Sequence, residues 1–144
     1  MSMFSNLFSA ADISASGMSA ERLRMETVAN NIANANSTRS EDGGPYRRKQ
    51  LVFSEMVGSN SNSPMGMGGV QVVSVKADET PFPVIYSPGH EDADEFGNLR
   101  LSNVKLPNEM VDMITASRSY EANLKALTSF KDMVEQTLTL LRLS

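Results

Sequence analysis

The feature that most constrains this chain is the repeat in its C-terminal segment. From Met110 onward, side chains recur in alternating steps of three and four residues, and only Ser117 and Lys131 are neither apolar nor aromatic. Such steps place side chains on one face of an α-helix. Because no Gly or Pro follows Pro107, the sequence predicts one helix over residues 108–142. Its predicted face is Met110, Met113, Ser117, Tyr120, Leu124, Leu127, Lys131, Val134, Leu138 and Leu141.

This helix carries more apolar surface than one partner can cover. Phe130, Met133, Leu140 and Leu143 extend the apolar surface around the end of the helix. A helix that is apolar on several sides must be enclosed by several neighbours.

The N-terminal segment repeats the pattern more weakly, and Gly17 predicts a bend or a break near its middle. Two complementary faces at opposite ends of a chain predict an antiparallel or staggered helical pair with the middle extruded between them. The N-terminal face is Phe4, Leu7, Ala11, Ser14, Met18, Glu21, Met25, Val28, Ile32 and Ala35.

An asparagine-rich run, residues 29–38, closes this first helix, which is expected to stop after Thr38. Each Asn costs a helix roughly half a kcal/mol relative to Ala, so the run has two interpretations. It is a fraying helix end, or it is a ladder of amides in which Asn30, Asn31 and Asn34 bond to a partner backbone or helix.

The middle of the chain favours β-structure. Strands are predicted within 46–57, 70–75, 84–86 and 99–101, and Ser87-Pro88-Gly89-His90 is typical of a tight turn. We therefore predict an α+β fold in which long, coiled-coil-like terminal helices form one domain (residues 1–38 and 104–144). Residues 39–103 form a small β-rich middle with a flexible loop at 58–69.

Composition removes several functions. The net charge of −4 disfavours nucleic acid, and the absence of Cys removes disulfides and thiolate chemistry. The segment 92–97 fails as a calcium loop because Phe96 and Asn103 stand where oxygen ligands are needed. His90 has no second ligand or catalytic partner in the sequence. We expect a soluble protein that is not an enzyme, with no metal, cofactor or small-molecule substrate, no membrane span, and no cleaved leader.

Several of these runs resemble one family. ANNIANANST (29–38) is similar to the N-terminal signature of bacterial flagellar rod and hook proteins. GGPYRRK (43–49), YSPGHEDADEFG (86–97) and EMVDMITASRSYEAN (109–123) resemble the proximal-rod proteins of type C, the FlgC family. The resemblance covers almost the whole chain in the same order, although the 58–69 loop matches no motif.

The resemblance implies a structural subunit of the basal body. It implies export by the flagellar type III apparatus, then assembly in the periplasm into a hollow helical rod that carries torque from motor to hook. Implied partners are copies of itself, other rod proteins, the rod-base adaptor and the membrane ring.

Roles follow for individual residues. Helix pairing is expected at Met18, Met25, Val28, Ile32, Met110, Met113, Leu124, Leu127, Val134 and Leu138. Contacts between subunits are expected at Asn30, Asn31, Asn34, Arg118, Tyr120, Glu121, Asn123, Leu140 and Leu141.

Two other classes stay open at this point. A cytoplasmic coiled-coil secretion chaperone or adaptor would suit the acidic pI and the Met-rich helices. An enzyme acting on peptidoglycan would need a catalytic carboxylate in a cleft. Copy number, helical symmetry and the partner of each face cannot be read from the sequence.

Overall fold

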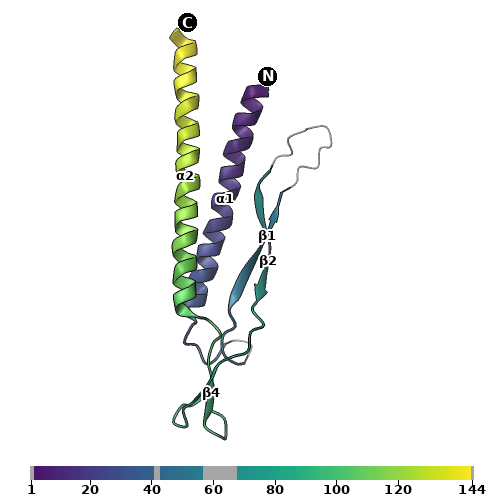
Figure 1. Ribbon diagram of the computed structural model, residues 1–144, viewed down its shortest axis with the longest axis vertical. Coiled ribbons are helices and arrows are strands. Elements are labelled where there is room, and N and C mark those ends of the chain that lie inside the picture. Colours follow the sequence, from purple (N-terminus) through teal and green to yellow (C-terminus); the bar gives the residue numbers. More distant parts are fainter. Residues whose placement is uncertain (1, 41–42, 57–67, 144) are drawn as a thin grey trace. The chain divides into compact units, whose positions relative to one another are not determined.

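Two long helices carry the ends of the chain, α1 (Ser2–Ala33) and α2 (Leu106–Leu143), and short strands lie between them in sequence (Figure 1). This computed structural model describes residues 2–40, 43–56 and 68–143, with side chains of the helices from residue 10 to residue 140. It contains two compact units, which we treat separately. The first unit is Met1–Leu23, Phe53–Val73 and Thr115–Ser144, and the second unit is Arg24–Val52 and Ser74–Ile114.

The helices contact each other within each unit. In the second unit, Arg24 pairs with Asp112 and Asn31 with Glu109, so α1 and α2 run antiparallel. In the first unit, a Cβ placed on Gly17 would lie 2.9 Å from Nδ2 of Asn123. The predicted break at Gly17 is wrong, because α1 continues through it, whereas the predicted bend stays a prediction. Gly17 instead permits a close approach to α2, where a larger residue would meet Asn123.

The first helix ends earlier than its repeat predicts. α1 stops at Ala33, and residues 34–36 form a turn in which Ala35 N–H donates to the Ile32 carbonyl at 3.2 Å. The Asn34 side chain donates to the Asn30 carbonyl at 2.9 Å and accepts from the Ser37 hydroxyl at 3.2 Å. These local bonds compete with the helical ladder and end the helix before Thr38.

The middle forms two small two-stranded sheets. β1 (Lys49–Glu55) pairs with β2 (Val70–Ala77), and β3 (Val84–Tyr86) pairs with β4 (Asn98–Arg100). The predicted strands are confirmed in place, with edges shifted by a few residues. The α+β class is therefore confirmed, whereas the predicted division into a helical domain and a β-rich middle stays a prediction. Most of the 58–69 loop, residues 58–67, lies outside the described residues.

The β3–β4 hairpin is antiparallel, with Tyr86 opposite Asn98. The predicted tight turn is confirmed, because His90 N–H donates to the Ser87 carbonyl at 3.2 Å. Gly97 has φ +78°, a conformation that L side chains rarely adopt, and the Tyr86 ring and Pro88 leave no room for a Cβ there. The connection between β3 and β4 is thus fixed both at the Ser87–His90 turn and at Gly97.

Candidate assembly surfaces and the polar cluster that positions them

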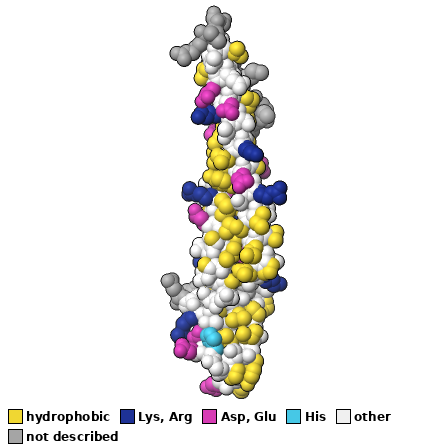
Figure 2. Space-filling model, turned by 90° about the vertical axis from the view of Figure 1, so that its left-hand side faces the viewer, with side chains coloured by type: hydrophobic (Ala, Val, Ile, Leu, Met, Phe, Trp, Pro, Cys, Tyr) yellow, Lys and Arg dark blue, Asp and Glu magenta, His cyan; other side chains and the backbone are white. Residues whose placement is uncertain are grey.

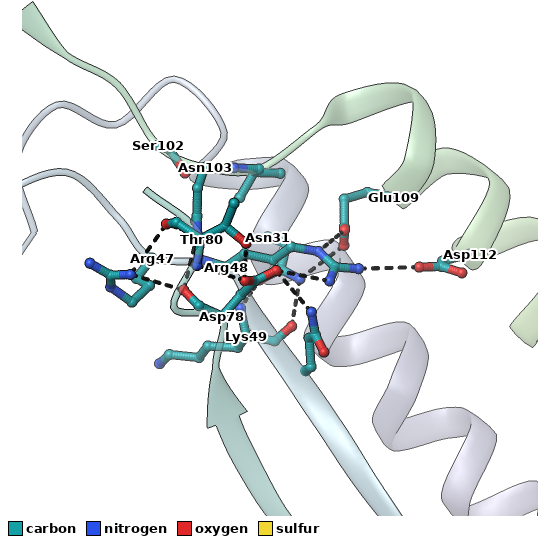
Figure 3. Close-up of polar contacts among 12 residues, drawn as sticks. Asn31, Arg47, Arg48, Lys49, Asp78, Thr80, Ser102, Asn103, Glu109 and Asp112 are labelled. Carbon is teal, nitrogen blue, oxygen red and sulfur yellow. Dashed lines mark hydrogen bonds and ion pairs between the residues drawn. The ribbon is translucent and has the colours of Figure 1, made fainter. Parts of the chain in front are cut away.

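A polar cluster in the second unit joins both helices to the β-rich middle (Figure 3). Arg48 lies at its centre, with its Nε 2.5 Å from Oε1 of Glu109 in the first turn of α2. Its two terminal nitrogens lie 3.5 Å from a carboxylate oxygen of Asp78 and 3.4 Å from one of Asp112. A guanidinium with several donors in a fixed fork suits such a junction.

Asn31 forms the second half of the cluster, which we name the Asn31–Arg48–Glu109 cluster. Its amide exchanges two hydrogen bonds with the backbone of Lys49, accepting at 2.9 Å and donating at 2.8 Å. The same amide donates to Oε2 of Glu109 at 2.9 Å and accepts from the Tyr46 hydroxyl at 3.0 Å. The end of α1 is thereby attached both to the start of β1 and to α2.

The cluster is buried and electrostatically balanced. Glu109 is 0% exposed and Asn31 is 1% exposed. Burial opposes the Arg48 charge, but its hydrogen bond with Glu109 and three neighbouring carboxylates outweigh this and raise the pKa of Arg48. Burial, and then the Glu109 charge, raise the pKa of Tyr46. Glu109 also lies at the helix N-terminus, where a negative charge is favoured.

This arrangement revises the expected role of Asn31. The sequence predicted a contact with another subunit, but the Asn31 amide is buried and fully used within its own chain. Asn30 is exposed and Asn34 is half-buried. The run is therefore a helix end in part. Its Asn31 bonds to a backbone, that of Lys49, and to a helix, through Glu109 of α2, within its own chain.

The inward face of α2 is offset from the predicted one. Met113, Tyr120, Leu127 and Val134 are half-buried, whereas Met110, Leu124 and Leu138 are 54%, 45% and 54% exposed. Neighbouring positions on the helix are buried instead. Glu109 is buried against Arg48, and Ala116, a small residue, is also fully buried. Among the described residues of α2, the buried or half-buried positions are Glu109, Asp112, Met113, Ala116, Ser117, Ser119, Tyr120, Asn123, Ala126, Leu127, Phe130 and Val134.

The four residues of α1 expected to pair with α2 are buried or half-buried. Val28 is buried, and Met18, Met25 and Ile32 are half-buried. Among the residues expected at subunit contacts, Arg118, Glu121 and Leu140 are exposed, whereas Tyr120 and Asn123 are half-buried. The Leu141 side chain lies outside the described residues.

An apolar surface remains uncovered on α2. We name it the apolar face of α2, and hydrophobic side chains are exposed along this part of the molecule in Figure 2. The fractions exposed range from 45% to 71%. The name covers exposed positions on more than one side of the helix: Met110, Val111 and Ile114 in the second unit, and Leu124, Met133, Leu138 and Leu140 in the first.

Sequence reasoning missed Arg48 and Glu109 as a pair. Both stand inside runs that carry the family resemblance, GGPYRRK and EMVDMITASRSYEAN. No spacing rule joins them, because they are far apart in the chain and meet only after the helices pair.

The described residues contain no group of three or more His, Cys, Asp or Glu that could hold a metal ion. Within that same part of the chain, neither helix is both long and apolar enough to cross a membrane. In the second unit, the buried polar groups of the Asn31–Arg48–Glu109 cluster are hydrogen-bonded within the chain. On α2, large apolar side chains are exposed. That combination suits a protein that acts by assembling.

Two family models match the chain. One, described as "Flagella basal body rod protein", matches residues 12–39, and one described as "Flagellar basal body rod FlgEFG protein C-terminal" matches residues 97–140. The two terminal helices lie largely inside these matches. The fold and the matches define the class of the chain as a flagellar basal-body rod protein.

Curated relatives narrow the class. Flagellar basal-body rod protein FlgC of Borreliella burgdorferi is 39% identical, covering 94% of this chain and 98% of the relative. The FlgC proteins of Aquifex aeolicus and Salmonella typhimurium are 46% and 40% identical, over 92% and 90% of this chain and 95% and 93% of theirs. The chain belongs to the FlgC family of flagellar basal-body rod proteins. It is a structural protein rather than an enzyme, as the sequence resemblance predicted.

Proposed function

We propose that the chain is a subunit of the proximal rod, which assembles with copies of itself into a hollow helical shaft that transmits torque from motor to hook. Family membership supports the rod, and the apolar face of α2 supports the self-assembly. The proposal assigns the terminal helices to the tube and the β-rich middle to the flank of each subunit.

The observation that carries the proposal is the exposure of large apolar side chains on α2, between 45% and 71% at seven positions. Full burial of a Leu-sized side chain is worth about 1.5–3 kcal/mol. Large apolar side chains exposed in such number mark interaction sites in soluble proteins. Neighbouring subunits would cover them.

Polar residues on the same helix would set how neighbours dock. Arg118 and Glu121 are exposed, and Tyr120 and Asn123 reach the surface in part. With Asn30, Asn34 and the apolar Leu140 and Leu141, they form our proposed subunit contact. Asn31 no longer belongs to this set, since its amide is used inside the chain.

The wider partners follow from the resemblance. They are other rod proteins, the rod-base adaptor, the membrane ring and the flagellar export apparatus, which would pass the chain to the periplasm. The alternative of a cytoplasmic chaperone gains nothing from the comparisons, because the matched relatives are named as rod proteins.

The test is Leu138→Glu, which places a charge on the exposed apolar face, against Gln136→Glu on the same helix as a matched control. We expect Leu138→Glu to abolish swimming and to remove the chain from isolated basal bodies, because burying an unpaired charge is costly. Gln136→Glu should swim normally. Normal swimming by the Leu138→Glu strain would contradict the proposal, and so would the absence of the unsubstituted chain from basal bodies.

A further inference from the structure

We infer that the tip of the β3–β4 hairpin of one copy docks into a basic, partly aromatic socket on a second copy. This inference rests on the proposed self-assembly, and it assigns to the β-rich middle a contact of its own. The tip is Glu91–Gly97, and the socket is lined by Arg39, Arg47, Lys49, Pro45, Tyr46 and Phe82.

The tip presents an aromatic side chain on a rigid turn. Phe96 is 80% exposed, and Tyr86 beside Gly97 is 73% exposed. Oδ1 of Asp94 accepts from the backbone N–H of Phe96 at 3.0 Å and of Asn98 at 2.7 Å. These bonds fix the backbone beneath Phe96 before any partner arrives. A preorganised aromatic anchor loses little entropy on binding and is typical of a binding hot spot.

The tip is also acidic. Glu91 and Glu95 are exposed, and neither carboxylate forms a hydrogen bond or ion pair within the described part of the chain. Asp92 differs, because it accepts from the Thr38 hydroxyl at 2.8 Å and lies 4.0 Å from Arg39. These contacts hold the base of the tip on its own chain while Phe96 faces outward.

The socket has the complementary chemistry. The socket is an open hollow of about 610 Å³. Its described lining contains three basic side chains and no acidic one. Arg47 lies 4.2 Å above the Phe82 ring and donates to the Asp78 carbonyl at 2.9 Å, so one wall is already ordered.

Charge selects a second copy of this chain as the occupant. An acidic tip around an aromatic residue complements a hollow lined by Arg47, Lys49 and aromatic side chains, with Arg39 already paired to Asp92 of its own chain. Because tip and socket are different surfaces of one chain, the contact between copies is head-to-tail. Contacts of that kind produce closed rings or open helical filaments, and a helical rod is the second of these.

A charge exchange tests the contact. Lys49→Glu and Glu95→Lys each place like charges together, so each is expected to reduce swimming, and the double variant is expected to restore it. The Lys49 backbone bonds to Asn31 do not involve its side chain, which lies 5.9 Å from the Tyr46 ring centroid, so we expect the fold to be retained. Lys76→Glu, at an exposed position outside the socket, is the matched control and should swim normally. Failure of the double variant to recover would overturn the inference.

Cross-linking identifies the occupant, because the chain has no cysteine of its own. Chains with Glu95→Cys and chains with Lys49→Cys are produced together, and isolated basal bodies are treated with a short bismaleimide. We expect a cross-linked dimer only when both chains are present. No dimer, a dimer from either chain alone, or a link to a different protein would overturn the inference. Absence of both chains from basal bodies would instead overturn the proposed function.

Discussion

The Asn31–Arg48–Glu109 cluster and the C-terminal part of the apolar face of α2 follow opposite rules. In the cluster, a fully buried carboxylate is matched by a guanidinium and an amide of the same chain. On α2 beyond Thr115, large apolar side chains such as Leu138 and Leu140 are 54% and 71% exposed. The difference is that the chain satisfies its buried polar groups by itself, whereas the exposed apolar side chains of α2 would be covered by neighbouring subunits.

Among single substitutions, one at Glu109 is expected to destabilise the Asn31–Arg48–Glu109 cluster most. Glu109→Ala leaves Arg48 without its closest partner and leaves one Asn31 hydrogen bond unmade. Breaking a buried ion pair in this way costs about 3–5 kcal/mol. We expect urea unfolding of the purified chain, followed by circular dichroism, to show a loss of that size.

Glu121→Ala, on the exposed side of the same helix, is the control for the loss of one Glu from α2. It should change the free energy of unfolding by less than about 0.5 kcal/mol. Equal losses in the two variants would mean that the cluster does not hold this unit together.

Acid is expected to weaken the same region. Hydrogen bonds from the Thr80 side chain and backbone, together with the Arg48 charge, hold the pKa of Asp78 below its usual 3.8. The unfolded chain therefore binds this proton at a higher pH than the folded chain does. The stabilisation is present above about pH 4 and is lost as the pH falls through the folded-state pKa.

The measurement is the free energy of unfolding between pH 7 and pH 3. Asp78→Asn should show a flatter decline than the parent chain. Thr80→Val, which removes a hydrogen-bond donor but keeps the carboxylate, should flatten it in the same direction. An unchanged slope in both variants would contradict the assignment to Asp78.

Asp112 tests the edge of the cluster. It lies between Arg24 at 3.3 Å and Arg48 at 3.4 Å, and about a third of its side chain is exposed. Partly exposed ion pairs are worth up to about 1 kcal/mol and weaken with salt. Asp112→Asn should therefore cost about 1 kcal/mol at low salt and less in high salt. A loss as large as that of Glu109→Ala would show that burial is not what distinguishes the two carboxylates.

Local patterns predicted the elements of this fold well. The absence of Gly and Pro after Pro107 located α2, and the Pro-Gly turn located the hairpin. The inward face of α2 was predicted less well, because periodicity ranks Met110 and Leu124 above Glu109 and Asn123. The choice between these faces depends on Arg48 and Gly17, which are distant in sequence, so it cannot be read from one helix.

The same limit applies to Asn31. Its neighbours in the sequence predicted an amide ladder, whereas its actual partners come from Tyr46, Lys49 and Glu109. Tertiary partners therefore decide which of several similar residues is an anchor. The β3–β4 hairpin was predictable because its turns are closed by residues within a few positions of each other.

The smallest change in the free energy of unfolding of the isolated chain is expected at Leu140, where the effect on assembly should be large. Leu140 is 71% exposed, and Gln has a similar helix propensity. Leu140→Gln should therefore change the free energy of unfolding by less than about 0.5 kcal/mol. It should nevertheless reduce the amount of chain in isolated basal bodies. In the proposed assembly, a neighbouring subunit would have to bury the glutamine amide in place of an apolar side chain. Val28→Ala, at a buried position of α1, should instead destabilise the isolated chain. If Leu140→Gln lowered the stability of the isolated chain as much as Val28→Ala does, Leu140 would already be covered within one chain, which would contradict the prediction.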